Sequence, residues 1–206
     1  LQEGGAYFQS QEVESILTRR RLTDMQIERL LWGRAKRIKN RERYIDFLRR
    51  FLVKRVANRV RLGIGYSYHA HRRSIPPLMR KINEQGLLVK GRPLRVASLA
   101  SGAGVFLVAL HDEAKKDSEA ARLTGHISTV ELDIDISRAM LDEARRIYQE
   151  RMYTGSIHQV TADVAALPLE AGKFDVTVIG FGMNQFQGQQ KHVAAIMEAH
   201  RSTRRG

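Results

Sequence analysis

The chain has 206 residues, of which 43% are hydrophobic, and its formal net charge is +13. It contains no cysteine, which excludes disulfides, thiolate metal sites, iron–sulfur clusters and a cysteine nucleophile. No apolar run approaches the roughly 20 residues that span a bilayer, and no secretory signal pattern is present. We therefore expect a protein without a transmembrane segment.

The positive charge lies in the first part of the chain. Residues 1–92 carry 22 Lys and Arg against 8 Asp and Glu, a net charge of +14, whereas residues 93–206 carry 13 against 14, a net charge of −1. A split this sharp indicates a basic extension, residues 1–92, followed by a near-neutral ligand-binding domain, residues 93–206. Nucleic acid is the first polyanion to consider, and an acidic membrane is the second.

The basic extension has a helical pattern, which follows a loose tail at residues 1–10. Thr23-Asp-Met-Gln26 forms a capping box, and apolar residues then recur at spacings of three, four and seven as far as Leu62. We expect breaks near Gly33 and Asn40 that divide the pattern into two helices.

Arg and Lys fill the remaining faces of these helices. Between Gly33 and Leu62 only Glu42 and Asp46 oppose them. An ordinary solvated helix face is one interpretation. Self-repulsion on this scale is relieved by a bound polyanion, so we favour contact with RNA. The predicted nucleic-acid contacts are Arg34, Arg37, Lys39, Arg41, Arg50, Lys54, Arg55 and Arg59.

The end of the basic extension shows a weaker pattern. We expect a loop at residues 63–71, and then a short helix over residues 74–83 that is capped by Ser74 and contains two prolines. The loop holds His69 and His71, but two histidines with no cysteine and no nearby carboxylate are weak support for a metal. We predict no metal site.

Strands and helices alternate from residue 93 onward. A first strand begins at Arg95, and later strands are predicted at residues 127–134, 157–161 and 174–179, with helices at 105–116, from Ser137, and at 189–201. This order predicts an α/β fold with a parallel sheet, helices on both of its faces, and right-handed crossovers. The basic helical extension precedes it.

The candidate ligand-binding residues fall at the carboxyl ends of the strands, where such sheets bind ligands. Glycines in the turn after the first strand permit a tight bend and a close approach to a ligand. The candidates are Ser98, Ala100, Ser101, Gly102, Gly104, Asp133, Asp135, Asp163, Gly180 and Gly182.

These residue types suit an adenosine ligand. An acid after the second strand can accept hydrogen bonds from both ribose hydroxyls. Asp135 is the first choice, and Asp133, which points the same way along a strand, is the second. Asp163 is placed to accept from the exocyclic amine of adenine. A dinucleotide site would have a glycine at Leu107, and a P-loop would have a lysine in the turn, so we expect a nucleoside cofactor without phosphates.

Over residues 94–202 the chain resembles the class I S-adenosylmethionine-dependent methyltransferases. Arg95–Gly104 resembles that family's first motif, Asp135–Leu141 its ribose-binding motif, Ala162–Pro168 its adenine-contact segment and Phe174–Met183 its fourth strand. The resemblance implies a Rossmann-like fold and S-adenosylmethionine as the cofactor, held by the candidate residues above. It also implies in-line attack on the sulfonium methyl, with Asn184 and Gln185 near the acceptor.

The chain departs from the family's pattern at three points. Ser98 stands where the family has an acid that helps to fix the methionine amino group, and Ala100 replaces the first glycine of the turn. The family's sheet also continues beyond its fourth strand. We therefore expect either further chain or a partner protein to cover the edge of this sheet, because an open apolar edge aggregates.

Three functions fit these observations. The first is a methyltransferase acting on RNA or within a ribonucleoprotein. The second is a catalytically inactive, methyltransferase-like structural or assembly subunit of a ribonucleoprotein such as an organellar ribosome. The third is a small-molecule methyltransferase with a membrane-facing basic helix. The absence of cysteine fits an intracellular, reducing compartment, and we expect the mitochondrial matrix or the cytoplasm.

Overall fold

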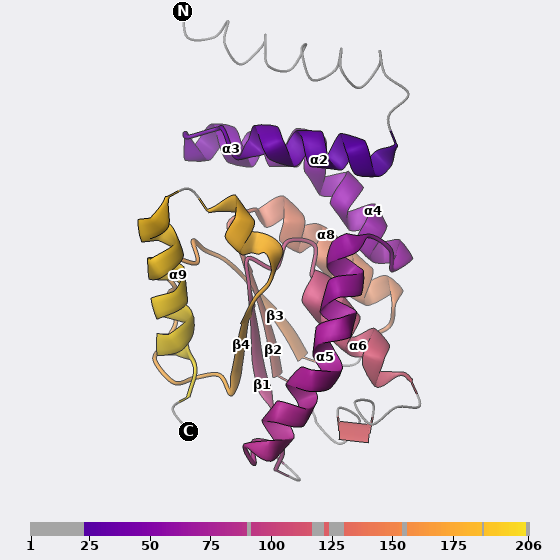
Figure 1. Cartoon of the computed structure of the whole chain (residues 1–206), viewed down its shortest axis with the longest axis vertical. Coiled ribbons are helices and arrows are strands. Elements are labelled where there is room, and N and C mark those ends of the chain that lie inside the picture. The colour runs from indigo at the N-terminus through magenta and orange to yellow at the C-terminus, as the bar shows by residue number, and fades with distance from the viewer. Residues whose placement is uncertain are drawn as a thin grey trace, which may run out of the picture.

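The computed structural model describes residues 23–89, 92–116, 122–123, 130–153, 156–186 and 188–204. The expected tail at residues 1–10 lies outside this part of the chain. Within it, four parallel strands pair in the order β3-β2-β1-β4 (Figure 1). They are β1 (Arg95–Leu99), β2 (Val130–Asp135), β3 (Ser156–Thr161) and β4 (Val176–Ile179). The predicted α/β fold with a parallel sheet is confirmed.

Helices cover both faces of the sheet, as Figure 1 shows. The helices α6 (Val105–Ala114) and α8 (Arg138–Glu150) lie on one face, and α9 (Gln189–Ser202) lies on the other. Side chains of β1 alternate between the two, so that Val96 joins the cluster with α6 and α8 while Ala97 and Leu99 join the cluster with α9. A strand that is covered on both faces reads as a continuous apolar run, which is why β1 could be recognised in the sequence.

The strand β2 carries acids on one face and apolar residues on the other. Leu132 and Ile134 belong to the cluster on the α9 side. Glu131, Asp133 and Asp135 alternate with them and are all buried on the α6–α8 side. Buried carboxylates require partners, and the first two find them on helices: Glu131 bonds His111 Nε2 at 2.8 Å, and Asp133 accepts from the hydroxyl of Tyr148.

The basic helices lie across one end of the sheet (Figure 1). They are α2 (Asp24–Ala35), α3 (Arg41–Phe47), the π-helix η1 (Leu48–Leu52) and α4 (Val53–Leu62), and we call them together the roof. The predicted capping box at Thr23 and the break at Asn40 are confirmed, because Thr23 caps α2 and the Asn40 side chain accepts from Arg43 N at 3.0 Å. Gly33 lies inside α2 and breaks no helix.

Arg151, at the end of α8, fastens the roof to the sheet domain. Its Nη1 donates to Asp112 of α6 at 2.6 Å, and its Nη2 donates to the carbonyls of Val60 and Arg61 in α4 at 3.3 and 2.8 Å. Leu52 and Val60 share one hydrophobic cluster with residues of α6 and α8. The domain boundary expected at residue 92 stays a prediction, and the core extends across it.

The predicted loop at residues 63–71 is wrong. The helix α5 (Tyr66–Glu84) begins within it and passes through Pro76 and Pro77. Ser74 is no cap but lies inside α5, where its Oγ donates to His71 O at 2.8 Å. A proline in a helix interior costs about 3 kcal/mol. Burial of one face against α6 offsets this cost, since each large apolar side chain contributes roughly 1.5–3 kcal/mol. That face consists of Tyr68, His71, Ile75, Met79 and Ile82.

The chain returns to the sheet after α9. Thr203 forms an isolated parallel bridge with Phe174, and Arg204 N donates to Phe174 O at 2.7 Å. This segment therefore begins to pair beside β4, at the edge where we expect further chain or a partner. No helix among the described residues combines the length and apolar character that crossing a membrane requires.

Candidate cofactor site

A cavity of about 1240 Å³ opens at the carboxyl edge of the sheet. The turn after β1 and the ends of β2 and β4 line it from one side, the roof from the opposite side, and α5 from a third. Ligand pockets are typically about 300–1,000 Å³. The space between the sheet and the roof is therefore large enough for a nucleoside cofactor together with a second small molecule.

Most of the predicted cofactor residues meet in this cavity. Asp133 and Gly104 are the exceptions, since neither lines it. The residues that do are Ser98, Ala100, Ser101, Gly102, Asp135, Asp163, Gly180 and Gly182. They come from four separate segments of the chain, so the parallel sheet brings them together as the sequence pattern predicts.

Asp135 fixes the position of the glycine turn. Gly102 N donates to its Oδ2 and Ser137 N donates to its Oδ1, both at 2.8 Å. Burial raises the pKa of Asp135, and backbone hydrogen bonds from Ser137, Gly102 and Ile136 oppose that rise. A carboxylate has about four acceptor sites, so beside these backbone bonds Asp135 keeps acceptor capacity for a ribose hydroxyl.

The glycine turn leaves open space for a ligand. Gly102 has φ +57°, and a Cβ placed on it would meet no other atom within 4 Å. Gly104, with φ +74°, lies instead against the hydroxyl of Tyr148, which occupies the position that a Cβ would take. The first glycine thus faces the cavity, and the second allows α8 to approach the start of α6.

Asp133 lies below this turn rather than in the cavity. It is fully buried and accepts from Tyr148, whereas its Oδ1 has no hydrogen-bond partner. Burial raises its pKa to about 7, and the neighbouring carboxylates of Glu131 and Asp135 add to the rise. Of the two acids considered for ribose, Asp135 is the one that a cofactor in the cavity can reach.

Asp163, the candidate for adenine, is held by two donors. Ala165 N donates to Oδ1 at 3.0 Å, and Lys191 of α9 donates to Oδ2 at 2.9 Å. Burial alone would raise the pKa of Asp163. The hydrogen bonds from Lys191 and Ala165 outweigh it, together with the charges of Lys191 and Arg41, and bring this pKa below its usual range. The group therefore stays ionised and available as an acceptor.

Among the residues that the structure describes, two buried polar side-chain atoms on the cavity wall have no hydrogen-bond partner. They are Ser101 Oγ and Gln185 Oε1. A buried polar group without a hydrogen bond is costly, commonly by about 1–3 kcal/mol. A ligand with polar groups in this cavity would satisfy both, and the donor set fits an adenosine cofactor with an amino-acid tail. Gln185 was expected near the acceptor, whereas the side chain of Asn184 lies outside the described residues.

Sequence reasoning missed several residues that line the cavity. His71 is one, because its helix was expected to be a loop; its ring contacts Gly180, whose added Cβ would lie 2.7 Å from His71 Cε1. Burial lowers the pKa of His71.

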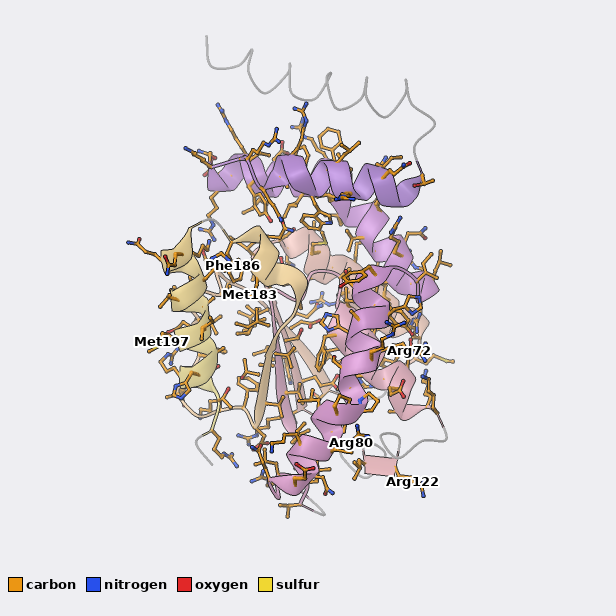
Figure 2. All side chains as sticks on the ribbon, in the orientation of Figure 1. Arg72, Arg80, Arg122, Met183, Phe186 and Met197 are labelled. Atoms are coloured by element: carbon orange, nitrogen blue, oxygen red, sulfur yellow. The ribbon has the colours of Figure 1, made fainter. Side chains whose placement is uncertain are left out.

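Tyr44 of α3 faces Asp135, and burial and the charge of Asp135 raise the pKa of Tyr44. Phe186, labelled in Figure 2 on the segment between β4 and α9, also lines the cavity. The spacing of Tyr68, His71 and Ile75 was the signal that marks His71 as inward-facing.

The predicted nucleic-acid contacts fall into two sets. Lys39, Arg41 and Arg59 line the cavity beneath the roof. Of the others, Arg50 pairs with Asp46 at 2.9 Å and Arg55 donates to Phe51 O at 2.8 Å. The exposed side chains that do not line the cavity are Arg37, Arg50 and Lys54, while Arg34 and Arg55 are half-buried.

Comparison with known proteins places this chain in a family. The profile of the ubiE/COQ5 methyltransferase family matches residues 70–206, from within α5 to the end of the sequence. The chain belongs to the ubiE/COQ5 methyltransferase family. A search of the curated proteins gives no match.

Solved methyltransferases share the fold. The magnesium protoporphyrin IX methyltransferase (ChlM) of Synechocystis PCC 6803, solved with bound SAM, has 16% sequence identity and a TM-score of 0.52, over 79% of this chain and 71% of its own. Its complex with SAH gives 17% identity and a TM-score of 0.51, over 77% of this chain and 66% of its own.

A more distant similarity is to the PH0226 protein of Pyrococcus horikoshii OT3, with 20% identity and a TM-score of 0.48, over 68% of this chain and 51% of its own. This chain spans about half the length of that protein. The predicted family is confirmed, and so is the predicted cofactor, S-adenosylmethionine, which the Synechocystis enzyme holds.

Proposed function

We propose that this chain binds S-adenosylmethionine in the cavity and transfers its methyl group to a small molecule held beneath the roof. The observation that carries the proposal is the position of Asp135. Its carboxylate lies at the cavity wall, held by Gly102 and Ser137, with acceptor capacity left for a ribose hydroxyl. Membership of a methyltransferase family supplies the reaction class.

The residues of the cavity have distinct roles in this proposal. Asp135 orients the ribose, Asp163 accepts from the adenine amine, and the hydroxyl of Ser101 accepts from the methionine ammonium group in place of the family's acid at Ser98. The bound cofactor supplies an electrophilic methyl group on a sulfonium. Most of the rate enhancement would come from positioning the acceptor, an effect that can supply roughly 7–11 kcal/mol.

His71 is the candidate proton acceptor. Its ring contacts Gly180, at the end of β4, and lines the cavity. Because burial lowers the pKa of His71, the imidazole is neutral near pH 7 and has a lone pair to receive a proton from an attacking hydroxyl or amine. Gln185 also lines the cavity near the fourth-strand edge, and its unpartnered Oε1 can orient the acceptor.

The roof favours a small acceptor over a folded RNA. Trp32, Leu48 and Val56 present apolar surface to the cavity from three roof segments. Pockets that bury most of a small ligand have such apolar linings. An RNA nucleotide would have to pass beneath these helices to reach the end of β4.

RNA remains a second candidate because of the roof's outer surface. Arg37, Arg50 and Lys54 are exposed there, and residues 1–92 carry a net charge of +14. An RNA-bound methyltransferase, or an inactive subunit of a ribonucleoprotein, would use that surface. A protein partner at the β4 edge and a location in the cytoplasm or mitochondrial matrix stay predictions.

Calorimetric titration of the chain with S-adenosylmethionine and S-adenosylhomocysteine tests the proposal. Asp135→Asn removes one acceptor position while keeping the shape of the side chain, and we expect its affinity for either ligand to fall at least tenfold. The matched control is Asp142→Asn, an exposed acid of α8 that pairs with Arg138 at 3.0 Å. Absence of binding by the folded chain would contradict the proposal and favour the inactive subunit.

A second titration separates the two acceptors. Binding of a labelled single-stranded RNA is followed by fluorescence anisotropy at rising salt, with Lys54→Gln as the variant. RNA affinity that falls steeply with salt and weakens in Lys54→Gln would support the RNA candidate. No measurable RNA binding, together with cofactor binding, would support a small acceptor.

A further inference from the structure

One buried carboxyl beside the cavity has no role in the proposed reaction. Asp133 lies on β2, is fully buried and does not line the cavity. Its Oδ2 accepts from the hydroxyl of Tyr148, whereas its Oδ1 has no hydrogen-bond partner in the part of the chain that the structure describes. A buried polar atom without a partner is costly, so a donor that reaches Oδ1 would stabilise this carboxyl.

The glycine turn places Ser101 next to Asp133. The backbone N–H of Ser101 donates to the carbonyl of Ile134, the residue after Asp133, at 3.0 Å. The hydroxyl of Ser101 faces the carboxyl of Asp133, and its Oγ also has no hydrogen-bond partner among the described residues. Because Ser101 lines the cavity, its hydroxyl lies between the buried carboxyl and any ligand at this wall.

The strand β1 presents a serine to the same place. Ser98 and Asp133 are partners in the parallel pairing of β1 with β2. Side chains alternate along a strand, so Ser98 lies on the same face of β1 as Val96, which is the face on which Asp133 is buried. Ser98 lines the cavity but carries no charge. The acid on this face therefore lies one strand further from the cavity, on β2.

A carboxyl in this position attracts a cation at the cavity wall. The attraction between opposite charges near a protein surface is roughly four times stronger than in water. A serine hydroxyl has one donor and two acceptor lone pairs. Ser101 can therefore donate to the carboxylate of Asp133 and accept from an ammonium group in the cavity at the same time.

The described groups that face Asp133 supply no such cation. Glu131 and Asp135, on the same strand, are acids, and both raise the pKa of Asp133. Tyr148 of α8 is neutral, because burial holds its pKa well above its ordinary value. His111 of α6 bonds Glu131, with Nε2 and Oε2 2.8 Å apart. A ligand cation is thus the charge that would match Asp133.

We propose that Asp133 is a positioning residue, which acts through Ser101 on the ammonium group of S-adenosylmethionine and releases its own proton when this cation binds. The O–H bond of the carboxyl breaks, the carboxylate keeps the electron pair, and the proton passes to solvent. The inference rests on the proposed function for the identity of the ligand. It assigns a role to a residue that does not touch the ligand.

The sign of the pH dependence follows from this proton. Burial raises the pKa of Asp133 to about 7 in the free protein. A bound cation stabilises the carboxylate and lowers this pKa, so that the proton and the cofactor oppose each other. Cofactor affinity should therefore rise about tenfold from about pH 5.5 to about pH 7, a range in which an α-ammonium group stays mostly charged. The pKa of Asp135 is raised as well, so a variant at Asp133 is needed to separate the two acids.

Calorimetric titration of the full chain with S-adenosylmethionine at these pH values, in two buffers with different heats of ionisation, measures the affinity and the protons released. At about pH 6 the parent should release close to one proton per cofactor, since most of a group with a pKa of about 7 is protonated there. Asp133→Asn can still accept from Tyr148 but cannot ionise. It should lose most of the pH effect and the released proton, and at about pH 7 it should bind about tenfold more weakly than the parent. Asp142→Asn, at an exposed position, should behave as the parent does.

Two further ligands identify the cation. S-adenosylhomocysteine keeps the ammonium group without the sulfonium charge, and we expect it to show the same pH effect and proton release. Methylthioadenosine has neither cation and should show neither effect. Ser101→Ala breaks the connection while Asp133 stays in place, so it should reduce the proton release. A purely structural role of Asp133 would affect all three ligands alike.

The outcomes separate the inference from the proposed function. Cofactor binding with a pH effect and proton release that persist in Asp133→Asn, or that methylthioadenosine also causes, would overturn the inference and leave the proposed function standing. Absence of cofactor binding by the folded parent at every pH would remove both. Thermal unfolding of each variant shows whether it is folded, and if Asp133→Asn is not, Ser101→Ala and the comparison of ligands on the parent chain decide the question.

Discussion

The methyl group of Ala100 occupies the space that a side chain at Gly182 would need. A Cβ added to Gly182 would collide with Ala100 Cβ and lie 3.1 Å from Ala100 O. Ala100 itself has φ +50°, one of two non-glycine residues with positive φ among those described. An L-residue in this left-handed conformation costs roughly 1–2 kcal/mol. The turn therefore holds a strained alanine that only a glycine on the neighbouring segment can accommodate.

This contact predicts opposite effects for two single substitutions. Ala100→Gly should raise the free energy of unfolding by up to about 1 kcal/mol, because relief of the strained φ exceeds the added freedom of the unfolded chain. Gly182→Ala should lower it by at least 2 kcal/mol, a typical magnitude for overpacking. Urea unfolding of both variants measures the two values.

The double variant Ala100→Gly/Gly182→Ala provides the decisive comparison. It removes the methyl–methyl collision. Its free energy of unfolding should therefore be higher than the sum of the two single changes predicts, by a coupling energy of about 1 kcal/mol or more. The contact with Ala100 O remains, which makes complete recovery unexpected. Strictly additive effects would show that the two residues do not share this space.

Local patterns were sufficient for the sheet and its cofactor edge. The apolar run of β1, the cap at Ser137, the acid at the end of β2 and the acid after β3 each lie within a few residues of the feature they indicate. Parallel strands all present their carboxyl ends at one edge. That rule is sufficient to predict that Asp135 and Asp163 lie at the same edge of the sheet.

The roof could not be predicted in this way, because long-range contacts position it. Arg151 bonds the carbonyl of Arg61 across 90 positions of the sequence, and no periodicity within α4 indicates that partner. The helix α5 was missed for a local reason, since Pro76 and Pro77 outweighed a regular buried stripe. The positive charge of the roof was recognised, but the sequence could not show that Lys39, Arg41 and Arg59 line a cavity.

Asp133 makes stability depend on pH. Its folded pKa is about 7 against an ordinary value of 3.8, so the folded state binds this proton more tightly than the unfolded state. The stabilisation of the folded state that this proton provides is fully present below about pH 4, and it is lost as the pH rises towards about 7. Glu131, Asp135, Ser101 and Tyr148 face the carboxyl, and the two acids raise its pKa further.

Asp133→Asn should remove this dependence, because an amide does not ionise and its oxygen can still accept from Tyr148. We compare the free energy of unfolding of the variant with that of the parent at two pH values. The difference, variant minus parent, should be roughly 2–3 kcal/mol larger at about pH 8 than at about pH 5, since one pKa unit corresponds to about 1.4 kcal/mol. Thermal or urea unfolding at both pH values gives the difference. Asp142→Asn, at an exposed position, controls for net charge, and an equal response in the two variants would refute the assignment to Asp133.

Arg151 is the residue whose loss should loosen the roof. Arg151→Met keeps the apolar stem but removes the donors to Asp112 and to the carbonyls of Val60 and Arg61. Hydrogen bonds to charged groups contribute about 1.5–3 kcal/mol, so the free energy of unfolding of this variant should be about 2–3 kcal/mol lower than that of the parent. Arg145→Met, at an exposed position on the same helix, should change stability by less than about 0.5 kcal/mol. Limited trypsin digestion adds a local readout: in Arg151→Met, cleavage after roof residues should precede cleavage in α6 and α8. Simultaneous cleavage of both regions would mean that the roof unfolds only together with the sheet. Arg151 would then stabilise the whole core and not the roof in particular.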